Sequence, residues 1–142
     1  MNQVEVLERG AGELAEVLPG FDFTVTGSGP SSGGPFASGE YRREDRRLKL
    51  HVRDSLGLVA YHVGEQSLAH EDLVRAVRAV RGVAGEPEYP GFSQNVLEAF
   101  RHLRADLERF GSVFVSGSID DFRALKRWAE DHPKAKGFAA PP

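Results

Sequence analysis

The sequence predicts an α+β fold, in which a small antiparallel meander of three to four strands packs one face against helices. Apolar and polar side chains alternate between Leu48 and Val63, which is typical of strands with one wet face. Apolar residues recur every three or four positions between residues 94 and 110, which is typical of a helix. The strand-like segments precede most of the helical ones. With 142 residues, of which 40% are hydrophobic, the chain fits a single domain over 1–142.

The first forty residues predict a helix, a strand, a loop and the start of a second strand. Apolar residues at helical spacing precede the stop at Pro19: Leu7, Ala11, Leu14 and Leu18. Residues 21–26 alternate like a half-buried strand. The loop at 27–35 contains a G-x-G, but it lacks the G-K-[ST] of a phosphate-binding loop, so a flexible connection is the favoured interpretation. A strand is expected over about 36–43.

Two segments, 48–53 and 58–63, form the strongest local pattern. Pairing Arg53 with Leu58 across a turn at 54–57 places Leu50 opposite Tyr61. Six apolar side chains then share one face: Leu48, Leu50, Val52, Val59, Tyr61 and Val63. A slip of one residue would mix the two faces, so the alternation predicts a hairpin with one buried face.

Three helices are expected after the sheet. Ser67, Ser93 and Ser118 are the candidate N-caps of these helices. The apolar run 113–115 is expected to form a short strand or a buried turn, and the tail from about residue 134 is expected to be loosely ordered. The apolar helix faces comprise Leu73, Val77 and Val80, then Val96, Phe100, Leu103, Leu107 and Phe110, then Phe122, Leu125 and Trp128.

The composition excludes several classes of protein. Cysteine is absent, which excludes disulfides and thiolate metal sites. No apolar run approaches the roughly 20 residues that span a bilayer, and the first residues lack the pattern of a secretion signal. A cytoplasmic protein with no cofactor and no membrane partner is therefore expected. The net charge of −3 argues against a general nucleic-acid binder, although residues 38–81 hold nine basic and seven acidic side chains.

The wet face of the predicted sheet is the candidate ligand- or partner-binding site, and it gathers Glu40, Arg42, Lys49, His51, Arg53 and His62. In the predicted register His62 faces Lys49, and His51 is its diagonal neighbour, roughly 7 Å away at the backbone. Two imidazoles and Glu40 have the chemistry of a divalent-metal site or of a general base oriented by a carboxylate. Lys49 and Arg53 repel a cation, so no metal is expected and an anionic ligand is favoured.

The favoured function is a non-catalytic protein-interaction module, because the sequence contains no recognised catalytic motif. The partner is an unknown protein or a second copy, since the apolar seam at 94–110 is long for one small sheet to cover. The alternative is an enzyme or small-anion-binding protein that uses His51 and His62. A third hypothesis, disfavoured by interleaved acidic residues, is nucleic-acid binding by stacking on Tyr41 and by four hairpin arginines: Arg42, Arg43, Arg46 and Arg47.

Two further features are expected to be structural. A helix face carries Arg75, Arg78 and Arg81, and Glu71 lies four residues before the first of these arginines, where the two can pair. His70 precedes Glu71 and is expected to take part in helix capping.

Overall fold

The protein has the predicted α+β fold, built on one strand more than the upper number expected. The computed structural model describes residues 2–28, 36–53, 55–89 and 95–134, and within these ranges five antiparallel strands form one sheet in sequence order. The strands are β1 (Asp22–Ser28), β2 (Ala37–Arg43), β3 (Arg46–Arg53), β4 (Ser55–Val63) and β5 (Gln66–Ala69). The helices are α1 (Gln3–Gly12), α2 (His70–Arg81), α3 (Val96–Phe110), α4 (Ser112–Ser116) and α5 (Ile119–Asp131), with a short 3₁₀ helix at Ala15–Val17.

Some predicted features lie outside the described residues: most of the loop at 27–35 and the tail beyond residue 134. Ser93 lies outside them as well, but it is not the cap of α3, because the side chain of Asn95 caps this helix by accepting from the amide of Leu97 at 2.9 Å. In the part of the chain that is described, no helix is long and apolar enough to cross a membrane.

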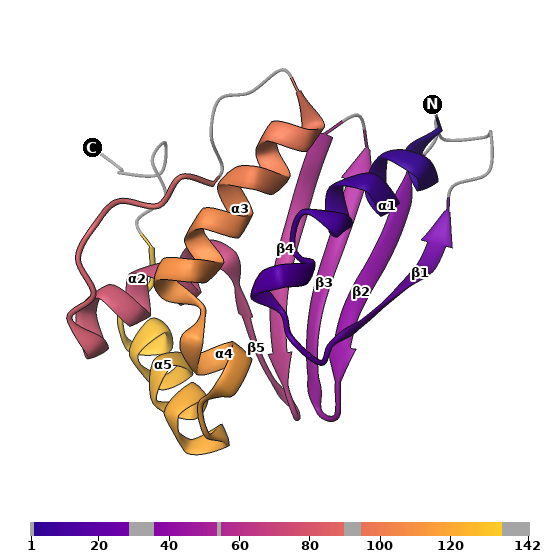
Figure 1. Cartoon of the computed structure of the whole chain (residues 1–142). Helices are drawn as coiled ribbons and strands as arrows, with labels where there is room; N and C mark the ends of the chain where they lie inside the picture. The colour runs from indigo at the N-terminus through magenta and orange to yellow at the C-terminus, as the bar shows by residue number, and fades with distance from the viewer. Residues whose placement is uncertain (1, 29–35, 54, 90–94, 135–142) are drawn as a thin grey trace, which may run out of the picture.

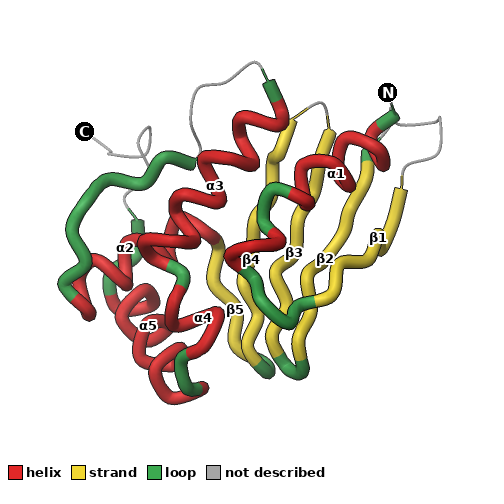
Figure 2. Tube along the Cα trace, in the orientation of Figure 1, coloured by secondary structure: helices red, strands yellow, loops and turns green. Residues whose placement is uncertain are grey.

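The helices pack on one side of the sheet, which we call the inner face. In Figure 1, α1 crosses in front of the strands, α3 runs beside β4, and α2, α4 and α5 gather beside β5. Figure 2 shows the same division between helices and strands. The six apolar residues that alternation places together are all on the inner face, and each is at most 4% exposed. The predicted face assignment is therefore confirmed.

The predicted register between β3 and β4 is wrong by two residues. Leu48 lies opposite Tyr61, and Leu50 lies opposite Val59. The connection is tighter than expected, because Arg53 pairs with Ser55 and the register shifts at a bulge around Gly57. Because side chains alternate with a period of two, a shift of two residues leaves every side chain on its predicted face.

Two short elements differ from the sequence-based expectation. Residues 66–69 form the edge strand β5, so Ser67 is a strand residue rather than a helix cap, and α2 begins at His70. The run 113–115 lies in the one-turn helix α4 instead of a strand or turn. Ser118 does cap α5, since its hydroxyl accepts a hydrogen bond from the amide of Asp121 at 3.0 Å.

The apolar seam of α3 is covered within the chain. Phe100, Leu103, Leu107 and Phe110 are each at most 3% exposed, and α1, α2 and α4 pack against the helix together with β4. The sequence-based reason for dimerisation therefore disappears, and dimerisation itself stays a prediction.

A close approach between α1 and α3 requires glycine at position 10. A Cβ at Gly10 would lie 2.2 Å from the Phe100 ring, whereas a Cβ at Gly12 would meet nothing within 4 Å. We expect Gly10→Ala to lower the free energy of unfolding by about 1–3 kcal/mol through overpacking. Gly12→Ala should leave it unchanged or raise it by up to about 1 kcal/mol through helix propensity. Urea denaturation of both variants measures the difference, and equal stabilities would contradict the packing.

Candidate functional site

The side of the sheet opposite the helices forms a continuous polar surface, which we call the outer face. Every side chain that points to it is at least partly exposed. Its members are Asp22, Thr24, Ser38, Glu40, Arg42, Arg47, Lys49, His51, Arg53, Leu58, Ala60, His62, Ser67 and Ala69. All six predicted site residues are among them.

The two histidines are not neighbours on this face. His51 lies opposite Leu58, and His62 lies opposite Arg47, four residues from His51 along β3. At about 3.3 Å per residue, their backbones are about 13 Å apart. The predicted imidazole pair is therefore wrong, because it depended on the register. Glu40 faces Lys49 across β2 and β3.

His51 is held in one orientation by its neighbours. Its Nδ1 lies 2.8 Å from the hydroxyl of Ser38 on β2, and its ring stacks on Phe36 with centroids 5.2 Å apart. Leu58 lies opposite His51 on β4 and is 54% exposed. We call these four residues the His51 corner. They combine a positioned aromatic pair with an exposed aliphatic side chain.

A row of basic side chains runs along β3 beside this corner. Arg47, Lys49, His51 and Arg53 point to the outer face at every second position, and we call them the β3 row. Among the described residues, Arg47 and Lys49 form no ion pair. The pKa of His62 is lowered by burial, then by the charges of Lys49 and Arg47, and Glu40 opposes this only in part. The row therefore creates a positive local potential.

The end of the outer face over β1 and β2 is different. A groove of about 630 Å³ lies there, and its charged lining consists of Asp22, Glu40 and Glu44 against Arg42 and Arg43. Carboxylates in this number repel a small anion, so an anionic ligand is disfavoured at this end.

The hairpin between β2 and β3 uses two of its four arginines inside the protein. Arg46 donates hydrogen bonds to the carbonyl groups of Val113, 3.0 Å away, Phe114 and Gly117. Arg43 donates to the carbonyl of Val115 and lies 4.5 Å from the centre of the Phe21 ring. Both guanidinium groups thus satisfy carbonyl groups at the end of α4.

Tyr41 is also unavailable to a ligand. It is 5% exposed, and its hydroxyl donates to the carbonyl of Ala11. The predicted stacking group is therefore buried, and half of the arginine cluster already donates to carbonyl groups of the protein, which removes most of the support for nucleic-acid binding.

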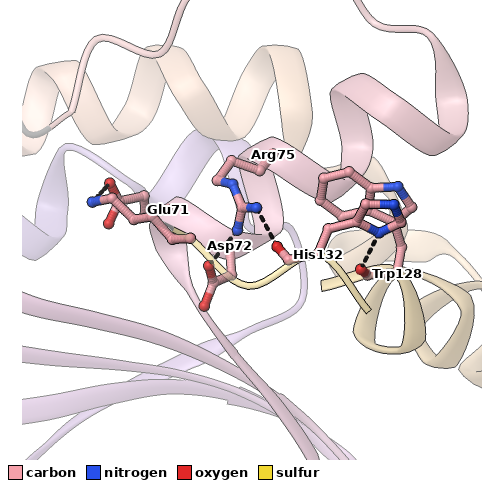
Figure 3. A network of polar contacts seen from close by, with 6 residues as sticks. Glu71, Asp72, Arg75, Trp128 and His132 are labelled. Atoms are coloured by element: carbon pink, nitrogen blue, oxygen red, sulfur yellow. Dashed lines mark hydrogen bonds and ion pairs between the residues drawn. The ribbon is translucent and has the colours of Figure 1, made fainter. Parts of the chain in front are cut away.

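Arg75 of α2 contacts the end of α5 (Figure 3), whereas Arg78 of the same helix pairs with Glu86 at 3.1 Å. Arg75 pairs with Asp72 at 3.0 Å, donates to the carbonyl of His132 and lies 5.3 Å from the centre of the Trp128 ring. The expected partner Glu71 pairs with Lys134 instead. These contacts fasten α2 to the end of α5, which agrees with the structural interpretation of this helix face.

The residues that sequence reasoning missed form a buried polar network. His70 and Asp106 are 4% and 2% exposed, and His70 Nε2 donates to Asp106 Oδ2 at 2.9 Å. His70 Nδ1 lies 2.7 Å from the hydroxyl of Tyr61. Asp106 also accepts the amides of Glu88 at 2.7 Å and Tyr89 at 2.9 Å. His70 is therefore a core residue, and the expectation of a capping role is wrong.

Because Tyr61, His70 and Asp106 are each at most 4% exposed, we interpret this hydrogen-bonded group as structural. A signal for it exists in the sequence. Asp106 lies three residues after Leu103 and four before Phe110, and His70 lies three before Leu73. A polar residue on an apolar helix face indicates a buried hydrogen-bonded group.

Comparison of the chain with protein-family models, with curated proteins and with solved structures gave no match. The described residues also contain no group of three or more acidic or histidine side chains able to hold a metal ion. The geometry of the outer face is therefore the main indication of function.

The positive potential of the β3 row predicts that removing one of its charges changes the pKa of His62. Lys49→Gln should raise its pKa toward the ordinary 6.5, while burial and Arg47 keep the pKa below that value. Because the pKa is lower in the folded chain than in the unfolded one, His62 weakens the fold as the pH falls below 6.5, and the variant should reduce this loss. NMR titration of the ring measures the pKa. Arg123→Gln on α5 is the control, and an unchanged pKa in Lys49→Gln would contradict the prediction.

The buried network predicts that a conservative substitution of Asp106 strongly lowers the free energy of unfolding. Asp106→Asn should lower the free energy of unfolding by about 3 kcal/mol, because an amide nitrogen replaces an acceptor that faces N–H donors. Asp131→Asn, at an exposed position, should change it by less than about 0.5 kcal/mol. Chemical denaturation compares the two, and a near-neutral Asp106→Asn would show that the network contributes little to stability.

Proposed function

We propose that this protein is a non-catalytic protein-interaction module, and that its partner docks on the outer face around the His51 corner. The observation that carries the proposal is the exposure of Leu58 beside an imidazole that Ser38 and Phe36 hold in place. Exposed apolar groups surrounded by polar ones are typical of interfaces. Side chains that are already ordered lose little entropy on binding.

The neighbours of Leu58 support the same proposal. Ala60 follows it on β4, and Ala69 lies opposite Ala60 on β5. These small side chains form a low apolar strip beside the β3 row. A partner can approach the backbone closely there, and the surrounding charged residues would form the polar rim of the interface.

The alternative, an enzyme or small-anion-binding protein, keeps only part of its support. The β3 row still favours an anion. However, His51 and His62 act at separate places, because about 13 Å of strand lies between them. Glu40 faces Lys49 and not His51, so it is not placed to orient His51 as a base.

A second copy of the chain is a less favoured partner than a different protein. Face-to-face pairing about a two-fold axis would bring two β3 rows toward each other, and like charges across an interface are unfavourable.

The proposal predicts that capture of a partner depends on the His51 corner. Purified protein immobilised as bait should retain specific proteins from a lysate of its own source. Leu58→Asn and His51→Ala should reduce their recovery by about tenfold or more, as expected for residues at the centre of an interface.

Val80→Asn is the matched control, because Val80 is 46% exposed on α2 and lies away from the outer face. Quantitative mass spectrometry compares the four baits. Recovery of the same proteins at the same level from all four would refute docking at this corner.

A further inference from the structure

We infer that the partner presents an acidic protein surface, whose carboxylates pair with the β3 row while an apolar group covers Leu58. This inference rests on the proposed function, and it names the chemistry of the partner at the same face. Three observations support it: the spacing of the row, its unbalanced charge, and the apolar strip beside it.

The spacing of the row suits an extended or flat acidic surface. Side chains two residues apart on a strand are about 7 Å apart, so the four members from Arg47 to Arg53 cover about 20 Å. Residues on a partner strand repeat at the same interval, and so an acidic segment that alternates charged and apolar residues matches the row in register.

Among the described residues, the charges of Arg47 and Lys49 are poorly balanced. Asp22 on β1 lies opposite Arg42, but Arg42 also lies directly opposite Arg47 on β3, and such a like-charge pair destabilises a sheet. Glu40 faces Lys49, but the two form no ion pair among the described residues. A chain with a net charge of −3 thus places Arg47 and Lys49 on the sheet face that no described helix covers. Carboxylates from a partner would offset this repulsion.

The apolar strip favours a protein over a nucleic acid. Leu58, Ala60 and Ala69 offer contacts to aliphatic side chains, whereas phosphodiester groups gain nothing from them. Phe36 is already stacked on His51, which leaves less of its ring for a base.

The experiment uses a fluorescent synthetic peptide in which glutamate alternates with valine, and anisotropy measures its binding to the full chain. A peptide with lysine in place of glutamate and a single-stranded DNA oligonucleotide are the competing probes. We expect the acidic peptide to bind more tightly than both, and high salt to weaken its binding.

The double variant Arg47→Glu, Lys49→Glu should weaken binding of the acidic peptide by about tenfold or more, because two attractions become repulsions. Arg123→Glu, Arg127→Glu on α5 changes the net charge equally and should leave binding within about twofold. Circular dichroism verifies that both variants are folded. Equal losses in the two variants, no binding of the acidic peptide, or tighter binding of the oligonucleotide would overturn the inference.

The same variants separate this inference from the proposed function. If Leu58→Asn abolishes capture of a protein that the Arg47→Glu, Lys49→Glu bait still retains, the partner is not acidic, although the docking face stands. If neither bait loses the captured protein, both the inference and the proposed function fail. If both baits lose it and the α5 control retains it, both are supported.

Discussion

The arrangement of the helices depends on the hydrogen bonds that the buried carboxylate of Asp106 accepts. A charged group away from water is very costly unless donors surround it, and three N–H groups from different parts of the chain do so here. They come from the start of α2 and from the segment before residue 90, and Tyr61 extends the network to β4. The network thus joins α2, α3 and β4 on the inner side of the sheet. None of these hydrogen bonds involves a side chain of the outer face.

The sequence predicted the two faces of the sheet more securely than the positions within each face. The face to which a strand residue points depends only on whether its position is odd or even. The predicted burial of Leu50 and Tyr61 is therefore correct although the predicted register is wrong by two residues. The distance between His51 and His62 depends on the register itself, which the bulge at Gly57 and the tight connection after Arg53 determine. Neither feature produces a distinct pattern of residues. The candidate face could therefore be predicted, but its internal geometry could not.

Contacts between distant segments explain the other misses. His70 and Asp106 are 36 residues apart in the sequence and meet only because α2 and α3 pack together. Each interrupts an apolar helix face, which indicates burial but does not name the partner. The short strand β5 and the one-turn helix α4 were missed for a related reason. Elements of four or five residues take their conformation from tertiary contacts more than from local periodicity.

The alternation of side chains between the two faces of the sheet also explains how a chain of net negative charge presents a basic surface. The hairpin places its four arginines on alternate sides of two strands: Arg43 and Arg46 turn inward to the carbonyl groups of α4, while Arg42 and Arg47 face outward. The inward pair finds acceptors at the end of a helix, where a positive charge is favoured. The outward pair lies side by side across the ladder, with Asp22 opposite Arg42 on β1. One run of similar residues therefore supplies both an internal brace and a charged surface, and the face to which each side chain points separates the two roles.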